Sequence, residues 1–273
     1  MTTPVNSTDA AHRAAERAAR DSYGRLLAWL AYRWRDLAAA EAALAAALLA
    51  ALTHWPARGV PDSPDAWLLA VARRNLLQAH RHRQVVDAHA LREWLEHEPS
   101  SATPPAVPDD RLKLLFVCAH PAINAAVRTP LMLQTVFGLD AARIAAAFLV
   151  APATMAQRLV RAKAKIRDAA IRYEEPAAEE LPERLHAVLE SIYAAYGTGW
   201  EAAFALPADL RPAPPATADG DFTGEALYLA TLVAELLPAA AEAQGLRALL
   251  MFCESRRAAH LDADGRFVPL TAQ

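Results

Sequence analysis

The chain has 273 residues, 54% of them hydrophobic, and its 28 Lys and Arg against 31 Asp and Glu leave a net charge of −3. This length exceeds the usual size of one domain, so two or three domains with sizeable cores are expected. Only nine glycines, few β-branched runs and persistent helical periodicity argue against a sheet protein. We therefore predict an all-α fold.

Cysteine content and hydropathy indicate where the protein works. Cys118 and Cys253 are too few for a disulfide framework, and the chain opens without the pattern of a secretory signal peptide. The most apolar stretch, residues 37–52, is shorter than the ~20 residues of a membrane span and contains Glu41. We expect a cytoplasmic protein that does not enter a membrane.

Proline-rich and polar segments predict the domain boundaries. Four prolines with Ser and Thr between residues 99 and 108 indicate a linker, and a short acidic joint begins at Glu174. The expected parts are a polar N-terminal lead (1–22), a first block (23–86), a linker (87–108), a second block (109–173) and a third block, a C-terminal helical extension (174–273).

In the first block, a helix is expected to begin at Pro64, because proline is favoured in a first helical turn. Trp67, Leu68 and Val71 would face inward. The polar and basic residues that follow are Arg73, Arg74, Asn75, Gln78 and Arg81. Helix surfaces with several arginines also occur in proteins that do not bind DNA, so this helix alone leaves its purpose open.

The second block ends in two helices joined by a turn. Asp140 is placed to cap a short helix, and Leu149–Pro152 then turns the chain. The next helix has an apolar stripe that includes Met155 and Ile166. Its polar, basic stripe follows the spacing i, i+3, i+4, i+7 and i+11 and consists of Thr154, Gln157, Arg158, Arg161 and Lys165.

This pattern predicts a helix-turn-helix with a cationic recognition helix, whose face would read the major groove and neutralise phosphates. The alternative is a solvated charged helix that packs on a core. Residues 153–173 carry six Lys and Arg and one Asp, a net +5, whereas residues 174–237 carry two Arg and twelve Asp and Glu, a net −10. We expect the third block to dock on the basic helix and shield it.

Several stretches together resemble one family. Residues 64–75, with Pro-x-x-Trp-Leu followed by Ala-Arg-Arg-Asn, are similar to the second conserved region of the sigma-70 family, and residues 110–121 and 148–163 to the fourth. Residues 181–185 and 262–265 are similar to a subgroup with a C-terminal helical, tetratricopeptide-like extension. The chain thus resembles an extracytoplasmic-function (ECF) sigma factor of bacterial RNA polymerase.

The resemblance implies that the chain directs promoter-specific transcription initiation, with promoter DNA and core RNA polymerase as partners. The first block would be a sigma region 2 helical bundle that binds polymerase and, through Arg73, Arg74, Asn75, Gln78 and Arg81, the −10 element. The second block would be sigma region 4, reading the −35 element through the polar, basic stripe. Catalysis would belong to the polymerase.

No stretch predicts an enzyme, a cofactor site or a metal site. Cys118 and His120 are two residues apart, which is a poor spacing for one helix face, and neither CxxC nor HExxH occurs. Residues 262–265 resemble the start of a calcium loop, but its twelfth position, which needs a bidentate glutamate, is Gln273.

One helix departs from the family pattern. The polymerase-binding helix of sigma factors usually carries an acidic, glutamine-rich face. Asp36 and Glu41 match that face and are the polymerase-binding candidates, whereas Ala42, Ala45 and Ala46 replace an acid, a glutamine and a second acid. Two functions therefore stay open: a working sigma factor, or a sigma-derived regulator with weakened polymerase binding. An alanine face would also admit self-association or a regulatory protein partner.

Overall fold

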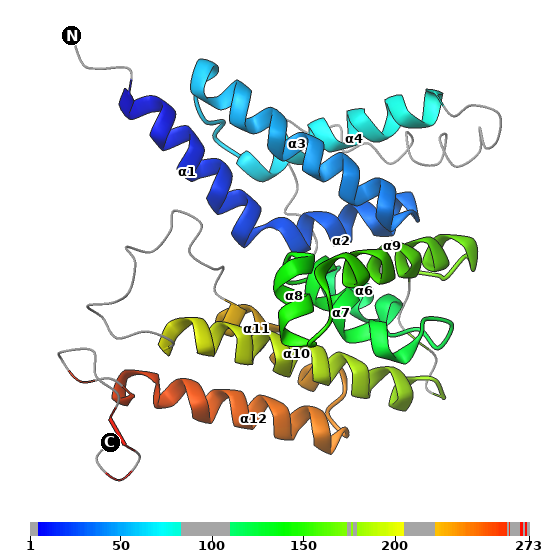
Figure 1. The fold of residues 1–273 in the computed structure, drawn as a ribbon, viewed down its shortest axis with the longest axis vertical. Coiled ribbons are helices and arrows are strands. Elements are labelled where there is room, and N and C mark those ends of the chain that lie inside the picture. The colour runs from blue at the N-terminus through cyan, green and yellow to red at the C-terminus, as the bar shows by residue number, and fades with distance from the viewer. Residues whose placement is uncertain are drawn as a thin grey trace.

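A computed structural model describes residues 5–82, 110–173, 176, 179–204, 222–260, 262, 268–269 and 271. Within these residues every regular element is helical, and the predicted all-α class is confirmed. The helices lie in three groups that follow each other along the chain, with the second block between the first and the third (Figure 1).

Four helices form the first group: α1 (Val5–Asp21), α2 (Tyr23–Trp34), α3 (Leu37–Arg58) and α4 (Pro64–His82). The segment assigned to a polar lead forms α1, which packs against α3 and α4. Its contact side is made of small residues, Ala11, Ala14, Ala15 and Ala18, all of them buried. Their spacing of i, i+3, i+4 and i+7 is that of one helix face.

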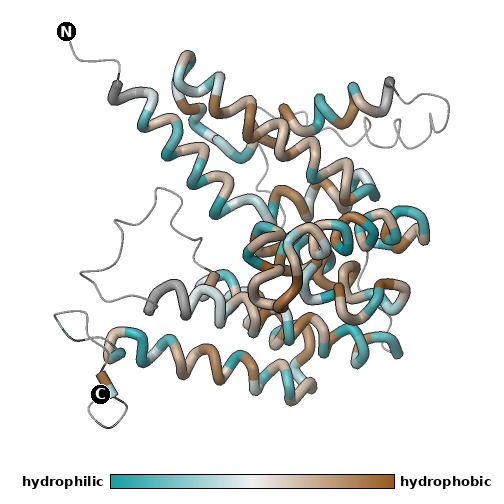
Figure 2. The backbone as a smooth tube through the Cα atoms, viewed as in Figure 1, coloured by the Kyte–Doolittle hydropathy of each residue, from teal (hydrophilic) through white to brown (hydrophobic). Residues whose placement is uncertain are grey.

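Helix α3 begins at a well-formed cap, where the Asp36 side chain accepts a hydrogen bond from the Ala39 N–H at 3.0 Å. Hydrophobic residues make up most of this helix (Figure 2). Among the described helices, α3 alone is long and apolar enough to cross a membrane by those two criteria, which core helices of soluble proteins also meet. Here α3 packs against α1, α2, α4 and α9.

The second group contains α6 (Arg111–Cys118), α7 (Ala125–Thr135), α8 (Ala141–Ala147) and α9 (Pro152–Asp168). Helix α6 is its centre, because Leu114 to Cys118 are all at most 1% exposed and the helix contacts α2, α7, α10 and α11. Asn124 caps α7 by accepting a hydrogen bond from the Ala126 N–H at 3.0 Å.

The third group contains α10 (Leu181–Phe204), α11 (Phe222–Leu236), α12 (Ala241–Ser255) and a short 3-10 turn (Arg257–Ala259). Helix α10 packs against α7 on one side and α11 on the other, and α12 forms the outer edge (Figure 1). Buried hydrophobic side chains from α1 to α12 form one continuous cluster, so the three groups share a core.

Candidate nucleic-acid interface

Helices α8 and α9 and the turn between them have the local geometry that the sequence predicts. The Asp140 carboxylate accepts hydrogen bonds from the N–H groups of Ala142 and Arg143, each at 2.9 Å, and so caps α8. Leu149 has a φ of 53° in the turn and is 95% exposed, and Pro152 begins α9. The predicted cap is confirmed.

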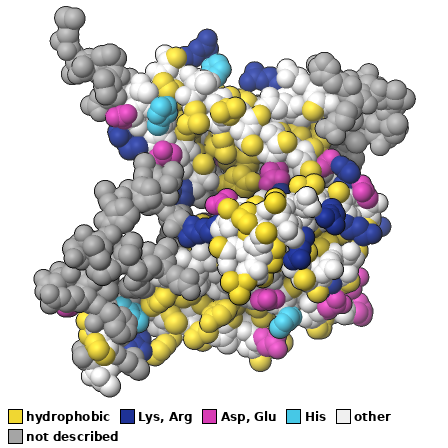
Figure 3. Space-filling view, viewed as in Figure 1, with side chains coloured by type: hydrophobic (Ala, Val, Ile, Leu, Met, Phe, Trp, Pro, Cys, Tyr) yellow, Lys and Arg dark blue, Asp and Glu magenta, His cyan; other side chains and the backbone are white. Residues whose placement is uncertain are grey.

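Helix α9 has one buried and one open face. Met155, Leu159 and Ile166 are each 1% exposed and anchor the helix on the second block. The five residues of the predicted polar, basic stripe are all exposed: Thr154, Gln157, Arg158, Arg161 and Lys165. Lys and Arg side chains gather over α9 in the space-filling view (Figure 3). The structure therefore brings all five onto one solvent-facing surface.

One basic residue of α9, Lys163, points away from this surface. The Lys163 side chain is 8% exposed, and its Nζ donates to Oε2 of Glu41 on α3. Sequence reasoning missed this contact. A signal was present, since Lys163 lies four residues after Leu159 and three before Ile166, which places it on the buried stripe rather than the exposed one.

The two polymerase-binding candidates both have partners within the chain. Asp36 caps α3, as described above. Glu41 accepts from Lys163 and, through Oε1, from the Tyr23 hydroxyl at 3.5 Å. Burial, and secondarily the neighbouring Glu41 carboxylate, raise the pKa of the Tyr23 phenol. The role of these carboxylates in polymerase binding stays a prediction.

The alanines expected to weaken polymerase binding lie on the open side of α3. Ala42, Ala45 and Ala46 are exposed, and Leu49 and Leu52 continue the same stripe at 66% and 41% exposure. This face presents no charged side chain from residue 42 to residue 52. It offers a partner apolar contact and close backbone approach, but no ionic contact.

On α4, the residues predicted to bind the −10 element are divided between surfaces. Arg74 and Gln78 are exposed one helical turn apart, whereas Arg73 and Asn75 are half-buried. Arg81 lies in the last turn of α4, and its side chain is outside the described residues. The exposed pair is thus the part of this set that is open to a ligand.

The third block does not shield α9, so that expectation is wrong for the described residues. Its carboxylates pair with the far side of the second block: Glu225 with Arg111 on α6, and Glu183 with Arg128 on α7 at 3.2 Å. These carboxylates therefore hold the third block on α6 and α7 and leave the polar, basic stripe of α9 open.

Cys118 and His120 have structural roles. The Cys118 thiol is fully buried, with Sγ 3.6 Å from Oγ1 of Thr135, and Nδ1 of His120 accepts from the Ala122 N–H at 3.0 Å within a turn. In the described parts of the chain, no three His, Cys, Asp or Glu side chains are grouped as for a metal ion. Of the calcium-like stretch 262–265, all but Asp262 lies outside those parts.

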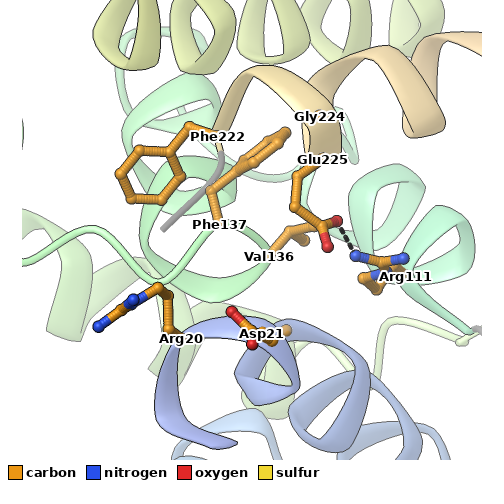
Figure 4. Close-up of a pocket in the computed structure, with 9 residues that line it drawn as sticks. Arg20, Asp21, Arg111, Val136, Phe137, Phe222, Gly224 and Glu225 are labelled. Carbon is orange, nitrogen blue, oxygen red and sulfur yellow. Dashed lines mark hydrogen bonds and ion pairs between the residues drawn. The ribbon is translucent and has the colours of Figure 1, made fainter. Parts of the chain in front are cut away.

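A cavity of about 240 Å³ lies where the three blocks meet. Figure 4 shows Arg20 and Asp21 at the end of α1, opposite Phe222 and Glu225 of α11, with Arg111 between them paired to Glu225. The cavity is smaller than most small-molecule sites, which measure roughly 300–1,000 Å³. Its lining carries two positive and two negative side chains, so its net charge is balanced. We therefore interpret it as part of the contact between the blocks rather than as a ligand site.

Comparisons with known proteins place the chain among relatives that carry no assigned activity. A family of unknown function (DUF6596) matches residues 184–273. An uncharacterized protein of Rhizobium meliloti (strain 1021) is 38% identical over 247 residues, which cover 88% of this chain and 56% of that protein. The chain thus spans about half the length of the curated relative it matches. No solved structure matches the chain.

Proposed function

We propose that this protein is a DNA-binding transcription factor of the ECF sigma type. The observation that carries the proposal is the open face of α9, where five polar and basic side chains project together while Met155, Leu159 and Ile166 fix the helix from behind. A helix fits the major groove, which is about 12 Å wide. Arg158 and Arg161 then supply guanidinium groups that bind guanine in a bidentate manner or clamp phosphate.

The first block supplies the second set of contacts under this proposal. Arg74 and Gln78 are available on α4 for the −10 element, and the open side of α3 faces core polymerase. Arginine and amide side chains suit unstacked bases and the sugar-phosphate backbone equally. The protein adds promoter recognition to the polymerase, acts in the cytoplasm and carries out no chemistry itself.

The second candidate is a sigma-derived regulator that binds polymerase weakly. Two observations favour it: Glu41 is paired with Lys163, and Ala42, Ala45 and Ala46 occupy the face expected to carry polar groups. A partner that buries its own charges against this face leaves them unpaired, which is costly. Such a regulator would act through DNA or through another protein.

The test of DNA binding compares two double variants of equal charge. Arg158→Ala/Arg161→Ala removes two guanidinium groups from the open face. Arg167→Ala/Arg172→Ala removes two exposed arginines near the end of the same region that are not part of the predicted stripe. Affinities are measured by fluorescence anisotropy on a library-selected duplex and on a random duplex at physiological salt, because phosphate contacts depend strongly on salt.

We expect the first variant to lose at least tenfold in affinity for the selected duplex, since each good bidentate base contact discriminates by about 1–3 kcal/mol. The control variant should lose affinity for both duplexes about equally, through its charge alone. Equal losses in the two variants on both duplexes would exclude the α9 face as the reader. A pull-down of core polymerase with the wild-type chain then separates the two candidate functions.

A further inference from the structure

The outer face of α12 carries hydrophobic side chains that remain exposed in the folded chain. The helix is attached through its opposite side, where Ala243 and Leu250 are fully buried. On the outer side Leu249, Met251 and Phe252 are 46%, 50% and 60% exposed. Because α12 forms the edge of the third block, this face points away from the other described helices (Figure 1). Contiguous exposed apolar surface marks sites that bind another protein.

The middle of this face is low at one end of the helix and high at the other. Ala241, Gly245, Ala248 and Phe252 are all exposed, and their spacing of i, i+4, i+7 and i+11 places them on one stripe. The first three are small, and a Cβ added at Gly245 would meet nothing within 4 Å. Phe252 then projects from the last part of the helix. A second copy that runs in the opposite direction fits this shape.

Three residues spaced by seven lie along one edge of the stripe: Glu242, Leu249 and Arg256. Seven residues are nearly two helical turns, so these side chains lie one above another. Glu242 is exposed at one end. At the other end the Arg256 guanidinium lies 5.5 Å from the centre of the Phe252 ring, which keeps it on the same face. Leu249 is midway between the two charges.

A twofold axis at Leu249 brings complementary groups together. In an antiparallel pair of α12 helices about this axis, Glu242 of each copy faces Arg256 of the other, and the two Leu249 side chains meet between these ion pairs. Phe252 follows Leu249 by three residues, so it faces the turn between the partner's Gly245 and Ala248. A parallel pair would instead place like charges beside each other at both ends.

We propose that the outer face of α12 is a homodimer interface, in which two copies of this chain pack their α12 helices antiparallel about Leu249. This goes beyond the proposed function, because it needs neither DNA nor polymerase. Helices α9 and α12 lie on opposite sides of α10, so each copy keeps its α9 stripe open (Figure 1). A helix of 15 residues is about 22 Å long, which makes a small interface of the kind found in weak, reversible complexes.

The first test blocks the low part of the face. Gly245→Lys places a long side chain where the partner's Phe252 would lie, and its Cβ meets no atom of its own chain. The matched control is Gly197→Lys on α10, another helical glycine at which an added Cβ meets nothing within 4 Å. Sedimentation velocity of the full chain measures self-association. We expect the wild type and the control to dimerise reversibly, and Gly245→Lys to dimerise at least tenfold more weakly.

The second test exchanges the charges and fixes the direction of the helices. Glu242→Arg and Arg256→Glu each place like charges opposite one another in the dimer, so each alone should weaken it roughly fivefold at low salt. In a mixture of the two variants both ion pairs can form again, and a heterodimer should be restored. Arg247→Glu, at a half-buried position off the face, is the control and should not restore association with Glu242→Arg.

A wild-type chain that stays monomeric up to about 0.2 mM, well above the micromolar range of weak complexes, would overturn the proposal and leave this face to a different protein. Equal dimerisation of Gly245→Lys and Gly197→Lys would also overturn it, as would a mixture of the two charge variants that fails to associate. Circular dichroism establishes that each variant keeps its helix content, and the charge variants decide alone if Gly245→Lys does not. Since DNA takes no part in these measurements, failure of the proposed function would leave their outcome unchanged.

Discussion

Two reactive groups of the second block, the Cys118 thiol and the Lys163 amine, are buried inside the protein. Cys118 is fully buried beside Thr135, and Lys163 is close enough to influence its charge. Burial raises the pKa of the Cys118 thiol to about 12, although Thr135 and Lys163 act in the opposite direction. A buried thiol of this kind is chemically inert, because the thiolate is the nucleophile.

We predict that a thiol reagent modifies Cys253 and leaves Cys118 unmodified in the native protein at pH 8. Cys253 is partly exposed, whereas Cys118 is both inaccessible and protonated. Mass spectrometry of iodoacetamide-treated protein gives the number and the position of the labels. In denaturant both thiols should react, which serves as the control, and modification of native Cys118 at a rate close to that of Cys253 would contradict the burial.

At the scale of the single element, α8 depends on one side chain. The helix has only seven residues, and Asp140 satisfies two of its first N–H groups. Short helices have little stability of their own, and an N-cap contributes about 0.5–2 kcal/mol. Since α8 packs on α9, the orientation of α9 depends partly on this cap.

Asp140→Ala should reduce the free energy of unfolding by about 0.5–2 kcal/mol, as measured by urea denaturation. Asp140→Asn keeps an acceptor oxygen and is the matched control, expected to lose much less. The alanine variant should also bind a selected duplex less tightly at a temperature where it remains folded. Equal stability of the two variants would mean that α8 is held by packing alone.

The open side of α3 makes a second prediction at this scale. Replacing Ala42, Ala45 and Ala46 with Asp, Gln and Glu should tighten core polymerase binding, since charge-assisted hydrogen bonds contribute about 1.5–3 kcal/mol each. Stability should change little, because exposed positions usually tolerate substitution within about 0.5 kcal/mol. The matched control is the same three residues placed at exposed positions of α12. Unchanged polymerase affinity in the α3 variant would remove this face from the proposed interface.

At the scale of the whole molecule, the three blocks share one core, and their charges are paired across the joints. Arg128 shows how tightly the third block is attached: it donates to the carbonyl oxygens of Ile123 and Pro121 and to Glu183. The acidic character of the third block thus complements buried arginines of the second. The basic and acidic residues that lie in separate segments of the sequence thus form ion pairs in the folded protein.

The shared core predicts one cooperative unfolding transition in the wild-type chain. Trp55 and Trp67 report on the first block and Trp200 on the third, whereas residues 110–173 contain no tryptophan. Urea denaturation followed by tryptophan fluorescence and by far-ultraviolet circular dichroism should give coincident curves. At Gly24 of α2, an added Cβ would overlap the carbonyl group of Val136 at the end of α7. In Gly24→Ala the two curves should therefore separate, because the first block loses its contact with the second. Separate curves in the wild type would mean that the blocks unfold independently.

Periodicity was sufficient for the features that depend on neighbours in the chain. The all-α class and the exposed stripe of α9 follow from spacings of three and four residues, and the Asp140 cap follows from the preference for Asp just before a helix; each is as the sequence predicts. The spacing of Ala11, Ala14, Ala15 and Ala18 also indicates a helix, but the small size of alanine made α1 resemble a polar lead.

Contacts between distant segments could not be predicted in this way. Glu41 and Lys163 are 122 residues apart in the sequence. The residues around each of them do not indicate that the two side chains form an ion pair. Likewise, the net charges of the two segments predict that the acidic third block docks on α9, whereas its carboxylates pair with α6 and α7. Net charge alone cannot distinguish Arg111 and Arg128 from the exposed cations of α9 as partners of those carboxylates.

The close approach of α2 to Val136 at Gly24 should be visible in the sequences of related proteins. Mutation supplies alanine at a helical glycine readily, and alanine is the more stable choice in an isolated helix. Where α2 does not approach Val136, selection does not act against the exchange of glycine for alanine. Where the approach is kept, alanine would overlap the Val136 carbonyl and is selected against. The residue that relatives carry at this single position therefore records whether their ancestors continued to fold the two blocks together.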